Sequence, residues 1–225
     1  MSDALEELEQ LLPSIPAAVE RQRVGAQLDR VNAKLSDFSS VTARFTAVGK
    51  VAALIDFRDE NFSEMKEAAI DAGRHLQGAA DETTLDLAGR SYEDLKTAIS
   101  AAERSIRNQW RTVITNDYKP LAVVGALLQR FGDTLETGRA MVRLAERADR
   151  SIALSMADLP AEIASLSNDR SKLEAEKASM TKNGEVDEFL TKLAAGKATL
   201  RSVTPSVYAW LREHDALEQM AVFAR

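Results

Sequence analysis

The feature that most constrains this chain is a run of apolar side chains between residues 24 and 55. They recur at steps of three and four positions, at Val24, Leu28, Val31, Leu35, Phe38, Val41, Phe45, Val48, Ala52 and Ile55. This spacing predicts a helix with a coiled-coil seam and one shortened step between Phe38 and Val41. Such a helix is about 48 Å long at about 1.5 Å per residue, so it needs a neighbour along its whole length. The sequence leaves open whether that neighbour is part of the same chain or another molecule.

The composition agrees with long helices that carry a narrow apolar seam. Charged residues make up 28% of the 225 residues and aromatic residues only 5%, a usage typical of such helices. The net charge of −6 argues against wholesale binding to nucleic acid or to an anionic membrane, because both need a positive face. A local basic patch is compatible with it. The chain has no cysteine, which excludes disulfides and zinc sites with thiolate ligands.

The start of the chain does not resemble a secretory signal. It carries Asp3, Glu6, Glu7 and Glu9 and no basic residue within its first ten positions, whereas a signal peptide begins with positive charge. No apolar run approaches the roughly 20 residues that span a bilayer. We therefore expect a cytoplasmic protein without a membrane partner.

Helical spacing of apolar residues recurs along the rest of the chain. We expect a short acidic helix over residues 3–12 and the long helix over about 16–58. Further helices are expected over about 62–76, 84–114, 121–156, 159–180, 186–200 and from 205 onward. Asn183-Gly184 has the chemistry of a helix stop and Thr204-Pro205 that of a helix start. No alternating segment predicts a strand.

A break in the helical pattern is expected at residues 116–120, because a proline disfavours the α conformation of the residue before it. A short connection between two long helices favours an antiparallel hairpin, so we expect the chain to turn near Asp117. Gly132 and Gly138 lie on or beside the next apolar seam. They either permit close approach of a neighbouring helix or merely weaken their own.

These patterns together predict an all-α protein, an elongated antiparallel helical bundle or coiled coil of about six to seven helices. The expected organisation has three parts. An acidic N-terminal helix occupies residues 1–15, a long-helix bundle occupies residues 16–183, and a C-terminal helical segment occupies residues 184–225 as a candidate docking element.

No motif for catalysis, cofactor binding or metal binding is evident. His75 and His214 are far apart and lie outside the histidine pairings of zinc and di-iron sites. The glycine-rich phosphate loops and the nucleophile elbow are absent. Carboxylates such as Asp56, Asp59 and Glu60 are typical of solvated helix faces. We therefore expect a protein that is not an enzyme, with no catalytic residue, cofactor, metal or small-molecule substrate.

Arginines gather on two predicted helix faces, away from the apolar seams. At 100° per residue the first face holds Arg104, Arg107 and Arg111, and the second holds Arg139, Arg143, Arg147 and Arg150. In a hairpin turning near Asp117 their centres would lie about 24 Å apart, so both could contact phosphates of a duplex. The reading we favour pairs these arginines with Glu103, Glu136 and Glu146 on the same helices. Trp110 beside the first face would stack on a base or, as we favour, pack at a seam edge.

The last predicted helix carries an apolar face formed by Val207, Trp210, Leu211 and Leu217. This face would dock into a partner groove or close the end of the chain's own bundle. The function we expect is that of a non-catalytic structural or adaptor subunit of a larger cytoplasmic assembly, acting through coiled-coil contacts with a protein partner or a second copy. The alternative is an accessory subunit that contacts nucleic acid through the two arginine faces.

Overall fold

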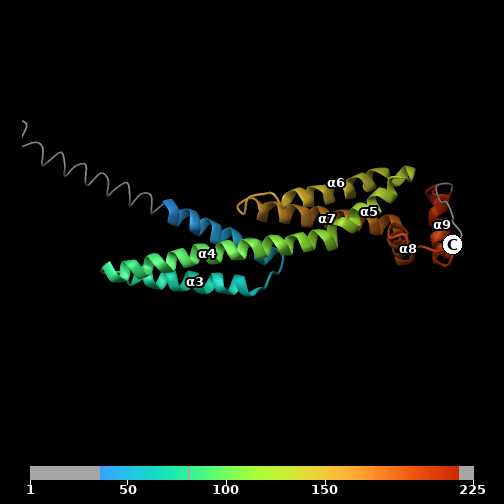
Figure 1. The fold of residues 1–225 in the computed structure, drawn as a ribbon. Coiled ribbons are helices and arrows are strands. Elements are labelled where there is room, and N and C mark those ends of the chain that lie inside the picture. The colour runs from blue at the N-terminus through green and yellow to red at the C-terminus, as the bar shows by residue number, and fades with distance from the viewer. Residues whose placement is uncertain (1–35, 81, 218–225) are drawn as a thin grey trace, which may run out of the picture. The chain divides into compact units, whose positions relative to one another are not determined.

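The computed structural model describes residues 36–80 and 82–217 (Figure 1). Every regular element in these ranges is helical, which confirms the all-α prediction for them. Residues 36–54 form one helix. The others are α3 (Glu60–Gln77), α4 (Glu82–Val113), the π-helix η1 (Ile114–Tyr118), α5 (Lys119–Leu128), the 3-10 turn η2 (Gly132–Thr134), α6 (Leu135–Ser151), α7 (Leu159–Thr181), α8 (Gly184–Ala194), the 3-10 turn η3 (Leu200–Ser202) and α9 (Pro205–Glu213). The chain divides into two compact units after Thr46, and all the labelled elements belong to the second.

The predicted seam helix is only partly within the described residues. The acidic helix expected over residues 3–12 and the first part of the 16–58 helix lie outside them. The described helix ends at residue 54, somewhat earlier than expected. In the second unit the seam residues Val48 and Ala52 are 0% and 2% exposed, so this end of the seam is buried.

Helices α3 and α4 form the first hairpin of the second unit. Asp59 caps α3 by accepting a hydrogen bond from the amide of Glu60 at 2.8 Å, as an N-cap carboxylate does. Asn61 of α3 donates a hydrogen bond from Nδ2 to Ser105 Oγ of α4 at 2.9 Å. Further along, His75 Nδ1 lies 2.6 Å from Ser91 Oγ. These side-chain contacts set the register of α3 against α4.

The break predicted at residues 116–120 is wrong, because α4, η1 and α5 follow one another as continuous helix. Buried residues recur at steps of four on one side, at Ile106, Trp110, Ile114 and Tyr118, each at most 3% exposed. In a straight α-helix a step of four rotates the side chain by about 40° each time. The wider π-turn absorbs that drift. Pro120 is the second residue of α5 and directly follows this π-turn.

The hairpin turn lies instead at residues 129–134. The helix predicted over 121–156 is therefore two helices, α5 and α6, that pack against each other. Thr134 stabilises the turn by donating from Oγ1 to the carbonyl of Leu128 at 2.7 Å. Gly132 lies in this turn and not on a seam. Gly138, in contrast, faces Gly125 of α5 at a close helix crossing.

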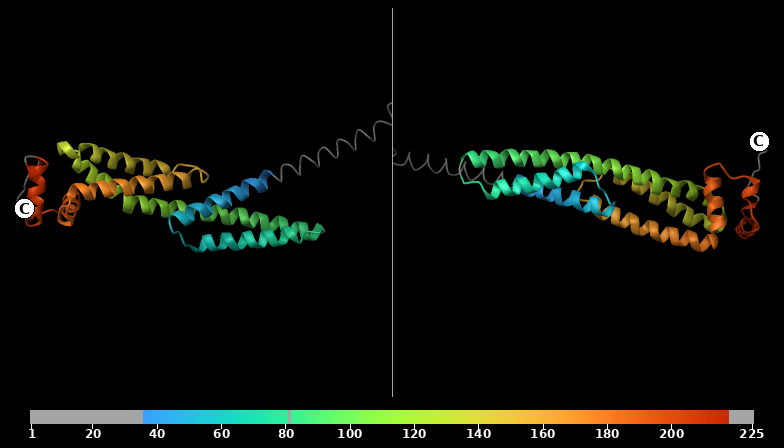
Figure 2. Two further views of the ribbon diagram at one scale, coloured as in Figure 1. Left: turned by 180° about the vertical axis from the view of Figure 1, so that it is seen from behind. Right: turned by 90° about the horizontal axis from the view of Figure 1, so that it is seen from below.

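Helix α7 packs back on α6, and both views in Figure 2 show these two helices side by side. The predicted start at Thr204-Pro205 is confirmed, since Thr204 Oγ1 accepts a hydrogen bond from the amide of Val207 at 3.3 Å. Asn183 likewise caps α8 directly after α7 has ended. Helices α8 and α9 share one apolar core with α5 and α6, formed by Val124, Leu128, Phe131, Met141, Val186, Phe189, Leu190, Val207, Trp210, Leu211 and Ala216. Residues 184–217 thus belong to the same packed unit as the long helices.

Candidate functional site

The arginines of the two predicted faces were the first candidate site, and Arg107 of α4 is turned toward the end of α6. Its guanidinium donates from Nη1 to the carbonyl of Ile152 at 2.7 Å and from Nη2 to the carbonyl of Leu154 at 3.0 Å. Carbonyls at a helix C-terminus have no partner within the helix, and a basic side chain commonly satisfies them. Arg107 therefore joins α4 to the end of α6.

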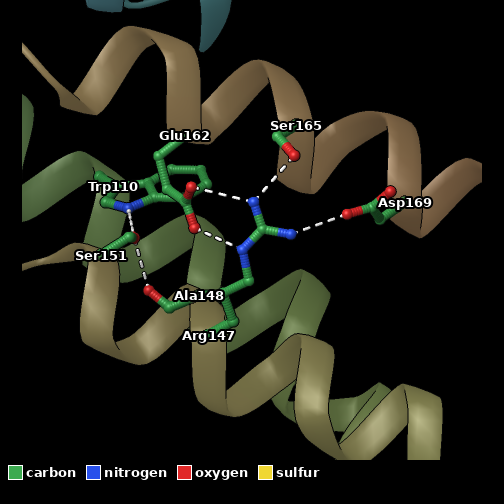
Figure 3. A network of polar contacts seen from close by, with 7 residues as sticks. All are labelled: Trp110, Arg147, Ala148, Ser151, Glu162, Ser165 and Asp169. Carbon is green, nitrogen blue, oxygen red and sulfur yellow. Dashed lines mark hydrogen bonds and ion pairs between the residues drawn. The ribbon is translucent and has the colours of Figure 1, made fainter.

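Arg147 of α6 lies at the centre of a polar network with α7 (Figure 3). Its Nε and Nη2 donate to the two carboxylate oxygens of Glu162 at 2.6 and 2.9 Å, Nη1 donates to Asp169 at 2.8 Å, and Nη2 also donates to Ser165 Oγ at 2.8 Å. The hydrogen bonds to Glu162 raise the pKa of Arg147 despite some loss of hydration. A two-point arginine–carboxylate contact fixes orientation as well as distance. Arg147 thus holds α6 and α7 in register.

Trp110 takes part in a neighbouring contact drawn in Figure 3. Its indole Nε1 donates to Ser151 Oγ at 2.8 Å, and Ser151 donates onward to the carbonyl of Ala148 at 2.6 Å. The side chain is 2% exposed and meets the Tyr118 ring edge-on at 5.9 Å between centroids. A tryptophan this buried has no face open for stacking on a base, so its role is in the core.

Arg170 of α7 is a third helix-joining arginine, and it belongs to neither predicted face. It donates from Nη1 to Asp117 at 2.7 Å and from Nε to Glu174 at 2.7 Å, and it lies 5.7 Å from the centroid of the Tyr118 ring. Burial lowers the pKa of Arg170, but the hydrogen bonds to Glu174 and Asp117 outweigh it and raise the pKa overall. Burial also raises the pKa of the Tyr118 phenol. The sequence feature that could have indicated this contact is Asp117, which is the one acidic residue between residues 104 and 130.

The remaining predicted arginines stay on the surface: Arg104, Arg111, Arg139, Arg143 and Arg150. Arg139 pairs with Glu136 at 2.7 Å, as the favoured reading expected. Within the described ranges no ion pair joins Arg150 to Glu146. Arg143 lines an open cavity of about 420 Å³ between α6 and α7.

The predicted separation of about 24 Å between the two arginine faces assumed a turn near Asp117, where the helix is in fact continuous. With the turn at residues 129–134, α6 runs back along the helix it follows. The end of α6 therefore lies beside Arg107 and Trp110, as their hydrogen bonds show. The two faces meet at this end, and their central arginines, Arg107 and Arg147, are occupied inside the fold.

The candidate docking residues of the last helix are largely buried. Val207, Trp210 and Leu211 are 0%, 4% and 1% exposed in the core shared with α5 and α6. Trp210 Nε1 also donates to the carbonyl of Met180 at 3.1 Å. Leu217 is 37% exposed. Three of these four side chains therefore close the chain's own core and are not accessible to a partner.

His214 and Asp59 each contact other side chains of the fold. His214 Nδ1 lies 2.6 Å from Asp133 Oδ2, and its ring lies 4.4 Å from the Trp210 ring. Side-chain hydrogen bonds from Asn61 and Ser105 hold the pKa of the Asp59 carboxyl below its ordinary value of 3.8. Across residues 36–80 and 82–217, no group of three or more histidine, aspartate or glutamate side chains could hold a metal ion.

None of the helices in the described part of the chain has the length and apolarity needed to cross a membrane. The chain matches no known family model, no curated protein and no solved structure.

Proposed function

We propose that this chain is a non-catalytic structural or adaptor subunit of a larger protein assembly, acting through helix–helix contacts. The observation that carries this proposal is the α3–α4 hairpin, which leaves large apolar side chains in solvent. Ile70, Leu76 and Leu87 are 62%, 42% and 46% exposed. A contiguous exposed apolar patch is a common feature of protein-binding surfaces, and we propose that these side chains on α3 and α4 contribute to one such surface.

The charge of α3 and the first part of α4 indicates the chemistry of the partner. Residues 59–94 hold ten acidic and three basic side chains, although the whole chain carries a net charge of only −6. A partner segment with complementary charge is therefore basic. A basic amphipathic helix would supply both the positive charge and the apolar side chains that this hairpin needs.

A hollow near the free end of the hairpin supports the same reading. It has a volume of about 440 Å³ and is lined by Thr83, Thr84, Asp86, Leu87 and Arg90. Helix-in-groove recognition places apolar anchors of a partner helix in such hollows, with polar groups around the rim. We propose that one anchor of the partner lies against Leu87 here.

The seam over residues 24–55 supplies a second helix–helix contact in this proposal through the part before Val48, since Val48 and Ala52 are already buried within the chain and Phe38 is 45% exposed. Its spacing is that of a coiled coil, and its partner is a helix of the same assembly or of a second copy. We propose on this basis that the helices build an elongated antiparallel bundle and that the assembly is cytoplasmic. The reading with two arginine faces on nucleic acid has less support, because Arg107 and Arg147 are bound to groups of the chain itself.

Copurification from the cytoplasmic fraction of the native source, followed by native mass measurement, tests the proposal. The wild-type chain is expected to bring down a partner in fixed stoichiometry. The variant Ile70→Glu/Leu76→Glu/Leu87→Glu is expected to lose it. The matched control is Leu200→Glu/Tyr208→Glu, at residues 70% and 52% exposed outside the hairpin, and it should retain the partner. A wild-type chain recovered alone as a monomer would contradict the proposal.

A further inference from the structure

The continuous helix α4–η1–α5 and the turn after it carry a second charged surface, of opposite sign to residues 59–94. Between residues 104 and 130 the exposed positions include four basic side chains and no acidic one. We name this surface the basic face; its charges are Arg104, Arg111, Lys119 and Arg130. Asn108 and Thr115 lie between them and are also exposed. Such a local excess is unusual in a chain with net charge −6.

The charges of the basic face are not neutralised within the fold. The one acid between residues 104 and 130 is Asp117, and Arg170 already pairs with it at 2.7 Å. Among the described residues, none of the four basic side chains takes part in an ion pair. Arg111 donates only to a neutral acceptor, Asn108 Oδ1, at 2.9 Å. The positive charge therefore remains available to a ligand.

The π-turn keeps Arg104, Arg111 and Lys119 on the side of the helix away from the core, and Arg130 follows in the turn directly after α5. Ile106, Trp110, Ile114 and Tyr118 are buried in sequence along the opposite side, so the exposed positions run through η1 into α5 without crossing to the core. At about 1.5 Å per residue, Arg104 and Arg111 are about 10 Å apart along the axis. Arg111 and Lys119 are about 12 Å apart, and the whole face is about 39 Å long. The first two steps are close to the width of a major groove, about 12 Å.

We propose that the basic face binds the sugar–phosphate backbone of a duplex nucleic acid without reading its sequence. Arginine, lysine, asparagine and threonine side chains are the usual donors to phosphate oxygens. A membrane is a poorer ligand, because a helix that lies on a bilayer needs a large apolar face. Here the exposed apolar side chains in the described part of α5 include a single large one, Val123, which is 48% exposed, beside the small Ala126. The proposal is independent of the partner assigned to the α3–α4 hairpin.

The Arg104 end of the basic face contributes less to phosphate binding than the rest of the face. Asp56 and Asp59 line an open cavity together with Asn108, so carboxylates approach this end. Carboxylates also lie near the segment from Arg111 to Arg130, because Leu121 lines another cavity with Glu174 and Asp187. In the part of the chain that the structure describes, however, no ion pair joins them to Arg111, Lys119 or Arg130. We therefore assign three to four phosphate contacts to the face, of which three come from Arg111, Lys119 and Arg130.

This inference differs from the interface with two arginine faces predicted from the sequence. It retains Arg104 and Arg111, replaces the occupied Arg107 by Lys119 and Arg130, and needs no residue of α6. The difference follows from the helix being continuous through Pro120. The two interfaces therefore make opposite predictions for substitutions on α6.

The test is binding of the full chain to a fluorescent duplex of about 30 base pairs of random sequence, over about 25 to 200 mM salt. The logarithm of the binding constant should fall with the logarithm of salt at a slope of about −0.9 per phosphate contact. For three to four contacts the slope is about −2.7 to −3.6, so each doubling of salt weakens binding about 6- to 12-fold. Circular dichroism checks that every variant has the wild-type melting temperature.

Two variants that remove equal charge decide the location. Arg111→Gln/Lys119→Gln/Arg130→Gln is expected to reduce the slope by about 2.7 and to abolish binding above about 100 mM salt. Arg139→Gln/Arg143→Gln/Arg150→Gln removes the same charge from α6 and is expected to leave the slope unchanged. Equal loss in the two variants, or no binding by the wild type at the lowest salt, would overturn the proposal.

Two further measurements exclude other ligands for the basic face. If vesicles with about one third anionic lipid bind while the duplex does not, the ligand is a membrane surface. If the first variant dissociates an oligomer that forms without nucleic acid, as seen by sedimentation, the ligand is the acidic hairpin of a second copy. Either result would also overturn the proposal.

Discussion

The crossing of α5 and α6 offers the sharpest stability test, because two glycines make it. A Cβ added at Gly138 would lie 2.6 Å from the carbonyl oxygen of Gly125 and 2.8 Å from the amide nitrogen of Gln129. Both are backbone atoms, so neither can rotate away. A Cβ at Gly125 would in turn lie 2.7 Å from the carbonyl oxygen of Gly138. Either alanine therefore forces the two helices apart by several tenths of an ångström.

The expected loss for Gly138→Ala follows from two opposing effects. Overpacking a close contact costs about 1–3 kcal/mol, while replacing a helical glycine by alanine returns up to about 1 kcal/mol of helix propensity. Because the two blocking atoms belong to the backbone, the overpacking cost lies in the upper part of that range, about 2–3 kcal/mol, and the net loss in unfolding free energy is about 1–2 kcal/mol. For a chain of this size about 1 kcal/mol lowers the melting temperature by about 2–4 °C. A fall of about 2 to 8 °C is expected.

Gly73→Ala in α3 is the matched control, because a Cβ there would meet nothing within 4 Å. It should stabilise the chain by up to about 1 kcal/mol, so the two substitutions have opposite signs. Urea denaturation followed by circular dichroism measures both. The double variant Gly125→Ala/Gly138→Ala should cost less than the sum of its parts, because one separation of the helices relieves both clashes. A Gly138→Ala chain stabilised as much as the Gly73→Ala chain would refute this account of the crossing.

Three further predictions concern the polar contacts. Arg147→Met should lower the unfolding free energy by about 1–2 kcal/mol, because it leaves two partly buried carboxylates without their donor. The control Arg143→Met, on the same helix, should change the unfolding free energy by less than about 0.5 kcal/mol. Equal effects of the two substitutions in urea denaturation would contradict the network around Arg147. Trp110→Phe should cost about 1–3 kcal/mol through the lost hydrogen bond and the smaller ring; a neutral effect in the same assay would show that the indole contact contributes nothing. The depressed pKa of Asp59 means that its contribution to stability is present above its ordinary value of 3.8 and is lost as the pH falls through the lower folded-state value. The destabilisation caused by Asp59→Asn should therefore be seen at about pH 6 and shrink as the pH falls below 3.8, and a penalty independent of pH would count against it.

Local signals in the sequence predicted several of the helices and some of their ends. The period of the apolar residues identified α3, α4 and α7, because one buried side of a helix requires that period. Thr204 was recognised as a helix start because a hydroxyl followed by proline satisfies the first free amide groups. These features depend on residues within one or two turns of each other, so the sequence alone contains them.

Only the tertiary structure decided where the chain reverses and which charges remain free. Pro120 looked like a break, but tolerance of a proline depends on what the neighbouring turns pack against, and the buried series from Ile106 to Tyr118 favours a π-turn. Gly125 was not singled out, because its role exists only beside Gly138 on another helix. The sequence position of Arg107 predicted the side of the helix on which it lies. It did not predict that its guanidinium donates to a carbonyl just after the end of α6. Contacts between residues distant along the chain depend on how the helices pack, and the spacing of apolar residues within a single helix does not determine that packing.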